Sequence, residues 1–188
     1  MTLLKNILTI ILVFSLFSCS SYPIEKGAQN TAQLCLGNSE LPASLKHNFE
    51  PVEDKSLLNG ALGKPNNGKL CQGQVYKSKK DTKVSIYRAW NSTNQNSKLG
   101  QWWAFKPPTG KISKYRAEYE ICYQWSPLDT LVSCTLKPGV TVVVGTGQSA
   151  ECSQYLTYSA SDKQQIFIKD ASMTVTNCTI LDGQFSWK

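Results

Sequence analysis

The central part of the chain, residues 84–168, holds side chains that can bind a charged aromatic ligand. Arg88 follows a short apolar segment, and its guanidinium can pair with a phosphate in a fork geometry. Trp103, Tyr115 and Tyr119 supply flat rings that can enclose an aromatic group between them. Together these residue types indicate a cleft for a flat ligand that carries phosphate.

The same aromatic residues have a purely structural interpretation. Trp102 and Trp103 can belong to the hydrophobic core, and Tyr115 and Tyr119 can form the buried face of a helix. Adjacent residues of a strand point to opposite faces, so at least one of the two tryptophans is expected to leave the core. The sequence leaves both interpretations of the rings open.

Several other catalytic and metal-binding chemistries lack the residues that they need. His47 is the only histidine, which argues against a Ser-His-Asp triad and excludes the two-histidine zinc motif. No glycine-rich phosphate loop occurs, and residues 145–147 predict only a turn. The few carboxylates of the central part form no obvious acid–base pair. They include Glu118, Glu120, Asp129 and Glu151.

The composition of the chain is typical of one folded domain, with 10% aromatic and 18% charged residues. The formal net charge of +7 favours anionic partners or simply serves solubility. The lysines are scattered and the longest basic run is Lys79-Lys80, so no nucleic-acid partner is expected.

The N-terminal sequence predicts a secretory leader. Lys5 provides a positive charge near its start, and the apolar run of residues 7–17 is too short to span a hydrocarbon core of about 30 Å as a helix. The leader ends in Leu16-Phe17-Ser18-Cys19, which resembles the cleavage box of bacterial lipoproteins. In that family the cysteine becomes the lipidated first residue of the mature protein. The alternative is an ordinary signal peptide that is cut nearby.

This leader divides the chain into three expected parts. They are a signal peptide over residues 1–18, a lipid-anchored tether over residues 19–33, and a single domain over residues 34–188. The acyl chains would hold the exported domain at a membrane surface of the bacterial cell envelope. With an ordinary signal peptide the domain would be secreted.

Six cysteines remain if Cys19 carries lipid, and an even number in an exported chain predicts three disulfides. The sequence does not choose among the fifteen possible connectivities. A zinc site is disfavoured because no Cys-x-x-Cys pair occurs, so no metal is expected. The six are Cys35, Cys71, Cys122, Cys134, Cys152 and Cys178.

Strand patterns outnumber helix patterns in most of the chain. Ser113 can cap a helix that runs to about Ile121, because Tyr115, Tyr119 and Cys122 then fall on one face. This order predicts an α+β fold with a mostly antiparallel, disulfide-stapled sheet and one or two helices. The strands are expected over residues 74–76, 82–90, 102–105, 131–136, 141–144, 154–158, 165–168 and 174–181.

The order of these features resembles that of the ADP-ribosyltransferase superfamily. In that family a first strand carries an arginine, as in Ile86-Tyr87-Arg88-Ala89. A strand with an aromatic residue then precedes a helix with a ring-stacking tyrosine, as Trp103 and Tyr115 do, and residues 134–144 resemble a later strand pair. Residues 100–155 are most similar to the necrotizing-toxin type of NAD glycohydrolase. The matching residues are Pro108-Thr109-Gly110, Arg116, Lys137-Pro138, Gly145, Gly147-Gln148 and Gln154-Tyr155.

This resemblance implies an ADP-ribosyltransferase-like fold and a NAD-consuming, toxin-like activity, with NAD as the substrate and no cofactor. Neither Glu-x-Glu nor Gln-x-Glu occurs in the strands expected after residue 130, and Gln154 falls where the catalytic glutamate would lie, 11 residues before Gln165. A glutamine is usual there in the necrotizing-toxin type, which hydrolyses NAD. The catalytic residues that the resemblance implies are therefore Gln154 and Arg88, with Glu151 as the alternative carboxylate, and the substrate-binding residues are Trp103, Tyr115, Tyr119 and Gln165.

The expected reaction is cleavage of the bond between nicotinamide and ribose, with water as the acceptor or, in a transferase, a protein. Preorganised dipoles at Gln154 would stabilise the charge that builds on the ribose as this bond loosens. The alternative is a non-enzymatic surface lipoprotein that binds a protein or glycan through an exposed aromatic patch.

Overall fold

The computed structural model describes residues 34–181, so the predicted signal peptide, the tether and Cys19 lie outside the described residues. The described part combines helices with three sheets whose paired strands run antiparallel. This confirms the prediction of an α+β fold with mostly antiparallel strand pairing, although the described residues form three sheets rather than one and three α-helices rather than one or two. Within residues 34–181 no helix has the length and apolar character that a membrane crossing requires.

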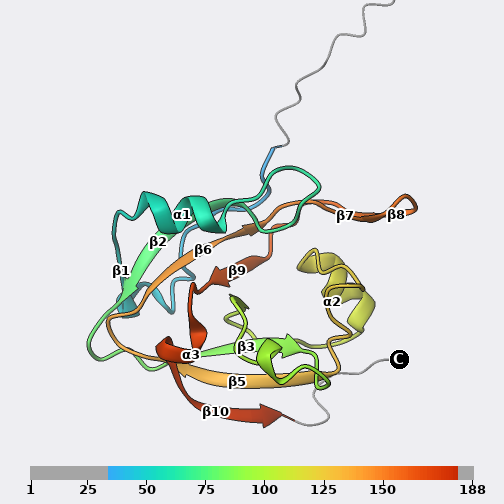
Figure 1. Cartoon of the computed structure of the whole chain (residues 1–188). Coiled ribbons are helices and arrows are strands. Elements are labelled where there is room, and N and C mark those ends of the chain that lie inside the picture. Colours follow the sequence, from blue (N-terminus) through green and yellow to red (C-terminus); the bar gives the residue numbers. More distant parts are fainter. Residues whose placement is uncertain (1–33, 182–188) are drawn as a thin grey trace, which may run out of the picture. The chain divides into compact units, whose positions relative to one another are not determined.

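The elements follow one another as Figure 1 labels them. The helices are α1 (Lys55–Ala61), α2 (Ile112–Glu118) and α3 (Ala171–Thr174), with 3-10 turns η1 (Lys46–Asn48) and η2 (Gln95–Ser97). The strands are β1 (Phe49–Pro51), β2 (Leu70–Ser78), β3 (Val84–Trp90), β4 (Trp102–Trp103), β5 (Thr130–Leu136), β6 (Thr141–Gly147), β7 (Ala150–Ser153), β8 (Leu156–Tyr158), β9 (Gln164–Phe167) and β10 (Val175–Leu181).

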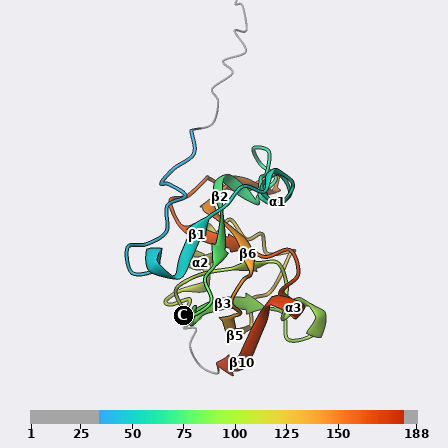
Figure 2. The same cartoon turned by 90° about the vertical axis from the view of Figure 1, so that its left-hand side faces the viewer.

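Two of the sheets enclose the main hydrophobic core. The five-stranded sheet has the order β1-β2-β6-β9-β4, and the three-stranded sheet has the order β10-β5-β3. Both views place α1 on one side of the five-stranded sheet and β3, β5 and β10 on the other (Figures 1 and 2). The core between the sheets includes Ile86, Trp103, Val142, Val144 and Ile166, all nearly inaccessible to solvent.

Alternating side chains of the same strands form a second cluster beneath α1. Val143 and Phe167 pack there with Trp102, while their neighbours in sequence face the main core. Trp102 and Trp103 thus point to opposite faces, as expected, and each packs in its own cluster. Trp103 is buried and Trp102 is half-buried.

A short backbone bridge joins the two large sheets. The amide of Tyr87 in β3 donates to the carbonyl of Ala104 at 2.9 Å, and the amide of Ala104 donates back to Tyr87 at 2.8 Å. The bridge therefore places Arg88, the next residue of β3, beside the strand that carries the two tryptophans.

The prediction of three disulfides is confirmed, and the fold determines their pairing. Cys35 bonds Cys71 and Cys134 bonds Cys178, the latter joining β5 to β10. The third disulfide joins Cys122, in the loop after α2, to Cys152 in the β7–β8 hairpin. Long-range pairs of this kind depend on which segments meet in space, which spacing along the chain does not reveal.

Three parts of the chain differ from the sequence-based expectations. Residues 145–147, which were expected to form only a turn, belong to strand β6. Helix α2 begins at Ile112, so Ser113 lies within it rather than capping it, and no side chain caps its N-terminus. The helix ends at Glu118 rather than near Ile121 because Glu120 adopts a left-handed backbone with a φ of 49°. Residues 154–158 are not one strand, because residues 154 and 155 form the turn between β7 and β8.

We expect Gly145→Ala to destabilise the five-stranded sheet. A Cβ at position 145 would lie 1.9 Å from the Gln72 carbonyl oxygen, so β2 and β6 must separate to admit it. The free energy of unfolding should fall by about 1–3 kcal/mol, measured by urea denaturation with the disulfides intact. Gly60→Ala in α1 is the control because a Cβ there meets nothing within 4 Å. It should raise stability by up to about 1 kcal/mol, and equal losses for both variants would contradict this packing.

Candidate active site

A cavity of about 160 Å³ opens between the two large sheets and the loop that follows α2. Its walls combine aromatic rings with a small number of polar groups, a mixture that is typical of small-molecule sites. The three-stranded sheet contributes the end of β3, the five-stranded sheet contributes β4 and β9, and the loop contributes residues 119–128. The lining is Lys69, Arg88, Ala89, Trp102, Trp103, Tyr115, Tyr119, Glu120, Ile121, Trp125, Ser126, Leu128 and Gln165.

The cavity brings together five of the residues that the sequence analysis selected. They come from four separate segments, β3, β4, α2 with its C-cap, and β9, which meet only in the folded chain. They are Arg88, Trp103, Tyr115, Tyr119 and Gln165.

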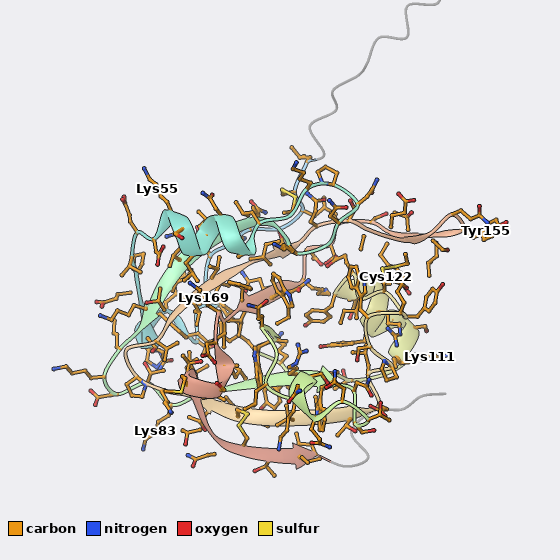
Figure 3. The ribbon with its side chains drawn as sticks, in the orientation of Figure 1. Lys55, Lys83, Lys111, Cys122, Tyr155 and Lys169 are labelled. Carbon is orange, nitrogen blue, oxygen red and sulfur yellow. A yellow bond between two sulfur atoms is a disulfide. The ribbon has the colours of Figure 1, made fainter. Side chains whose placement is uncertain are left out.

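Two of the three predicted catalytic residues, Gln154 and Glu151, are not among the residues that line this cavity. Both side chains are exposed on the β7–β8 hairpin, and Gln154 lies in its turn. Figure 3 shows the neighbouring Tyr155 at the far end of this hairpin, where its side chain is 88% exposed. The side chains of a two-residue turn point outward to solvent. Gln154 therefore lies outside the cavity that Gln165 lines, although only 11 residues separate the two in sequence.

Glu120 supplies the carboxyl group of the cavity. Its side chain is only 2% exposed, and its Oε2 accepts a hydrogen bond from Gln165 Nε2 at 2.9 Å. A Cβ at Gly147 would lie 1.7 Å from this oxygen, so a glycine in β6 makes the space that the carboxyl group occupies. The other oxygen, Oε1, is buried and accepts no hydrogen bond among the described residues.

Burial raises the pKa of Glu120 from its ordinary 4.5 to about 8, because the carboxylate loses its hydration. Ser161 and Gln165 oppose this shift by hydrogen bonding. The Ser161 hydroxyl donates to the Glu118 carbonyl at 2.7 Å, and no hydrogen bond of ordinary length and angle reaches Oε1 from the described residues. At neutral pH the free protein therefore holds a mostly protonated carboxyl group with an unpaired oxygen at the cavity.

The sequence analysis recorded Glu120 but assigned no role to it. Glu120 completes the pattern Glu118-Tyr119-Glu120, a Glu-x-Glu that lies at the end of the expected helix rather than in a strand, and the left-handed turn that buries it is a tertiary feature. A non-glycine residue with positive φ, a buried carboxyl group and a raised pKa together are typical of functional sites.

Arg116 and a disulfide hold the loop that forms one wall of the cavity. Arg116 Nη1 donates to the carbonyls of Ile121 and Cys122 at 3.2 and 3.3 Å, and Nη2 donates to Ser126 at 2.6 Å. The Trp125 amide donates to the Cys122 carbonyl at 3.0 Å, and Cys122 is bonded to the hairpin. This network places the exposed ring of Trp125 at the cavity, although the sequence analysis did not select that residue.

Arg88 uses two of its three nitrogens to donate hydrogen bonds to backbone carbonyls of the protein. Its Nε donates to the Ser97 carbonyl at 2.9 Å, and its Nη1 donates to the Trp102 carbonyl at 2.8 Å. Burial lowers the pKa of this guanidinium to about 10. Gly100 packs against it so closely that a Cβ there would lie 2.4 Å from Nη2. Arg88 thus braces the segment that carries Trp102 and still contributes to the cavity wall.

The two tyrosines form an aromatic wall. The rings of Tyr115 and Tyr119 are tilted against each other with centroids 4.5 Å apart. Burial raises the pKa of Tyr119 to about 12 and raises the pKa of Tyr115 as well, so both hydroxyls stay neutral. The aromatic wall can therefore offer ring faces to a ligand without adding charge.

We expect Glu120→Gln to stabilise the protein at alkaline pH. The unfolded carboxyl group titrates near 4.5 and the folded one near 8, so between these values the folded protein binds a proton that the unfolded chain has lost. The free energy of unfolding should therefore fall by a few kcal/mol as pH rises through this window. Urea denaturation should show Glu120→Gln equal to the parent near pH 4 and more stable above about pH 8.

Glu151→Gln is the control for this comparison because Glu151 is exposed. It should follow the parent protein at every pH. A difference between parent and Glu120→Gln that does not change with pH would contradict a buried, protonated Glu120.

The site thus combines a buried acid, an amide, a guanidinium and aromatic walls around one small cavity. Within residues 34–181 no group of three or more His, Cys, Asp or Glu side chains is arranged to hold a metal ion. No family model, no curated protein and no solved structure matches the chain.

Proposed function

We propose that the cavity binds the nicotinamide ring of NAD and that the protein hydrolyses the bond between nicotinamide and ribose. The observation that carries the proposal is the meeting of Glu120, with its unpaired buried oxygen, and the aromatic and amide groups that the sequence selected. In this proposal Glu120 and Gln165, which line the cavity, take the role that was expected of Gln154, the stabilisation of charge on the ribose.

The size of the cavity supports a single ring as its occupant. An engineered protein cavity of about 150 Å³ binds benzene, and the cavity here measures about 160 Å³. The remainder of a dinucleotide would extend outside it, past Trp125 or Trp102.

The charge of the ring also suits this wall. The nicotinamide of NAD is a pyridinium with a formal positive charge, and aromatic faces such as those of Tyr115 and Tyr119 attract cations. Ionised Glu120 would complement the same charge, so binding of the ring would lower its pKa and expel a proton.

The reaction requires few groups. As the bond between ribose C1 and the ring nitrogen breaks, its electron pair leaves with nicotinamide, which becomes neutral, and positive charge develops on the ribose. Ionised Glu120 stabilises this charge and accepts a proton from the water that attacks C1. Gln165 keeps the carboxylate in place through its bond to Oε2. The products are nicotinamide and ADP-ribose, and the proton leaves Glu120 to solvent.

A non-enzymatic function is the second candidate, and the exposed rings favour it. Tyr155 is 88% exposed at the hairpin turn, and Tyr123 and Trp125 are 57% and 53% exposed in the loop after α2. Exposed aromatic side chains of this kind suit contact with a protein or glycan. Three disulfides indicate an oxidising environment for either candidate function. With either function, the proposal includes a lipid anchor at Cys19.

We expect the purified mature protein to release nicotinamide from NAD above a protein-free blank. Glu120→Gln should lower turnover by about 100-fold or more, because the amide cannot accept the proton of water. Glu151→Gln and Gln154→Ala should retain turnover, since both side chains lie outside the cavity. No release from the parent protein would leave the binding function as the explanation of the exposed rings.

The pH profile tests the ionised form of Glu120. We expect kcat/KM for NAD to rise with pH and to level above about pH 8, because the raised pKa keeps the free protein protonated below it. The residual rate of Glu120→Gln should show no such rise. A rate that falls through the same window would assign Glu120 as an acid rather than a base and contradict the proposed step.

A further inference from the structure

We infer that a groove beside the cavity binds the phosphate-bearing part of the ligand through Lys69 and Lys169. This inference rests on the proposed function for the identity of the ring, but the groove is defined independently by its own residues. It lies on the α1 side of the five-stranded sheet, where Figure 3 labels Lys169.

The groove and the cavity share part of their walls. The groove has a volume of about 450 Å³, within the range of roughly 300–1,000 Å³ that small-molecule sites occupy. Lys69 and Trp102 line both spaces, so a ligand can pass from one to the other across these two side chains. The remaining lining is Asp54, Ser56, Leu57, Gly60, Gln101, Phe167 and Lys169.

The charge of the groove favours an anion. Lys69 and Lys169 face one carboxylate, that of Asp54. Asp54 caps α1 by accepting a hydrogen bond from the Leu57 amide at 2.8 Å. Neither lysine forms an ion pair with another residue of the described part. The groove therefore presents two ammonium groups that no protein anion neutralises directly.

Lys69 is held in position at this junction. Its Nζ donates to the Gly60 carbonyl at 3.1 Å, which leaves two of its three N–H groups for a ligand. Its own carbonyl accepts the Gln148 amide at 2.9 Å, and its backbone has a φ of 67°. A non-glycine residue in this conformation persists only where the surrounding structure requires it.

Arg88 is less suited to the same phosphate. Two of its nitrogens already donate to the Ser97 and Trp102 carbonyls, and the guanidinium packs against Gly100. The groove lysines are exposed, so a phosphate can reach them while it keeps part of its hydration. Trp102, tilted against Phe167 with ring centroids 5.0 Å apart, forms the apolar surface between ring and phosphate.

The test compares one ligand that carries a phosphate with two that do not, of which the riboside differs from it in the phosphate alone. Quenching of tryptophan fluorescence would give the Kd of nicotinamide, nicotinamide riboside and nicotinamide mononucleotide for the parent protein and for a Lys69→Gln, Lys169→Gln double variant. We expect the double variant to weaken binding of the mononucleotide by about tenfold or more and to leave the two phosphate-free probes unchanged. The advantage of the mononucleotide over the riboside should also shrink at high salt.

A Lys83→Gln, Lys111→Gln double variant is the matched control. It removes the same charge from exposed lysines that line neither space, so it should leave the Kd of every probe unchanged. Equal weakening of the mononucleotide by both double variants would overturn the inference, because it would reflect net charge alone. Equal weakening of all three probes by the groove variant would also overturn it.

Inorganic pyrophosphate separates this inference from the proposed function. If pyrophosphate competes with a fluorescent phosphate probe on the parent protein but not on the groove variant, the groove binds phosphate even when NAD is not hydrolysed. If NAD is hydrolysed with the same KM by parent and groove variant, the proposed function stands and the groove inference fails.

Discussion

The buried carboxyl group of Glu120 is the constraint around which the described part of the chain is arranged. Its oxygen atoms lie in a low-dielectric space, where Gln165 donates a hydrogen bond to Oε2, and its backbone adopts a left-handed conformation. Both features oppose folding, so the surrounding structure must compensate for them. Gly147 opens the space for the carboxyl group, and residues from two sheets close around it.

The scaffold around this group is rigid for identifiable reasons. The bridge between Tyr87 and Ala104 joins the two large sheets beside the cavity, and Arg88 braces the segment that follows η2. On the other side, Arg116 and the Cys122–Cys152 disulfide hold the loop that carries Trp125. A cavity between two sheets and one cross-linked loop can keep its shape without a ligand, which limits the ordering cost of binding.

Much of the fold was accessible from local sequence patterns. A strand is predicted over residues 141–144, and β6 contains these residues, with Val142 and Val144 in the main core and Val143 beneath α1. Arg88, the candidate aromatic rings and Gln165 line one cavity. The position of Gln154 could not be predicted from local patterns. In a polar stretch of unknown register, a turn residue and a strand residue have the same sequence pattern.

The sequence by itself determined most of the strands, the six cysteines after Cys19 that are available for disulfides, and the residue types that can contact a flat charged ligand. These follow from short-range periodicity and from chemistry that each residue carries wherever it lies. Only the tertiary structure decided the disulfide pairing, the exposure of Gln154 and the burial of Glu120. Each of these depends on segments distant in sequence, and the pKa of Glu120 is raised by the desolvation that those segments impose.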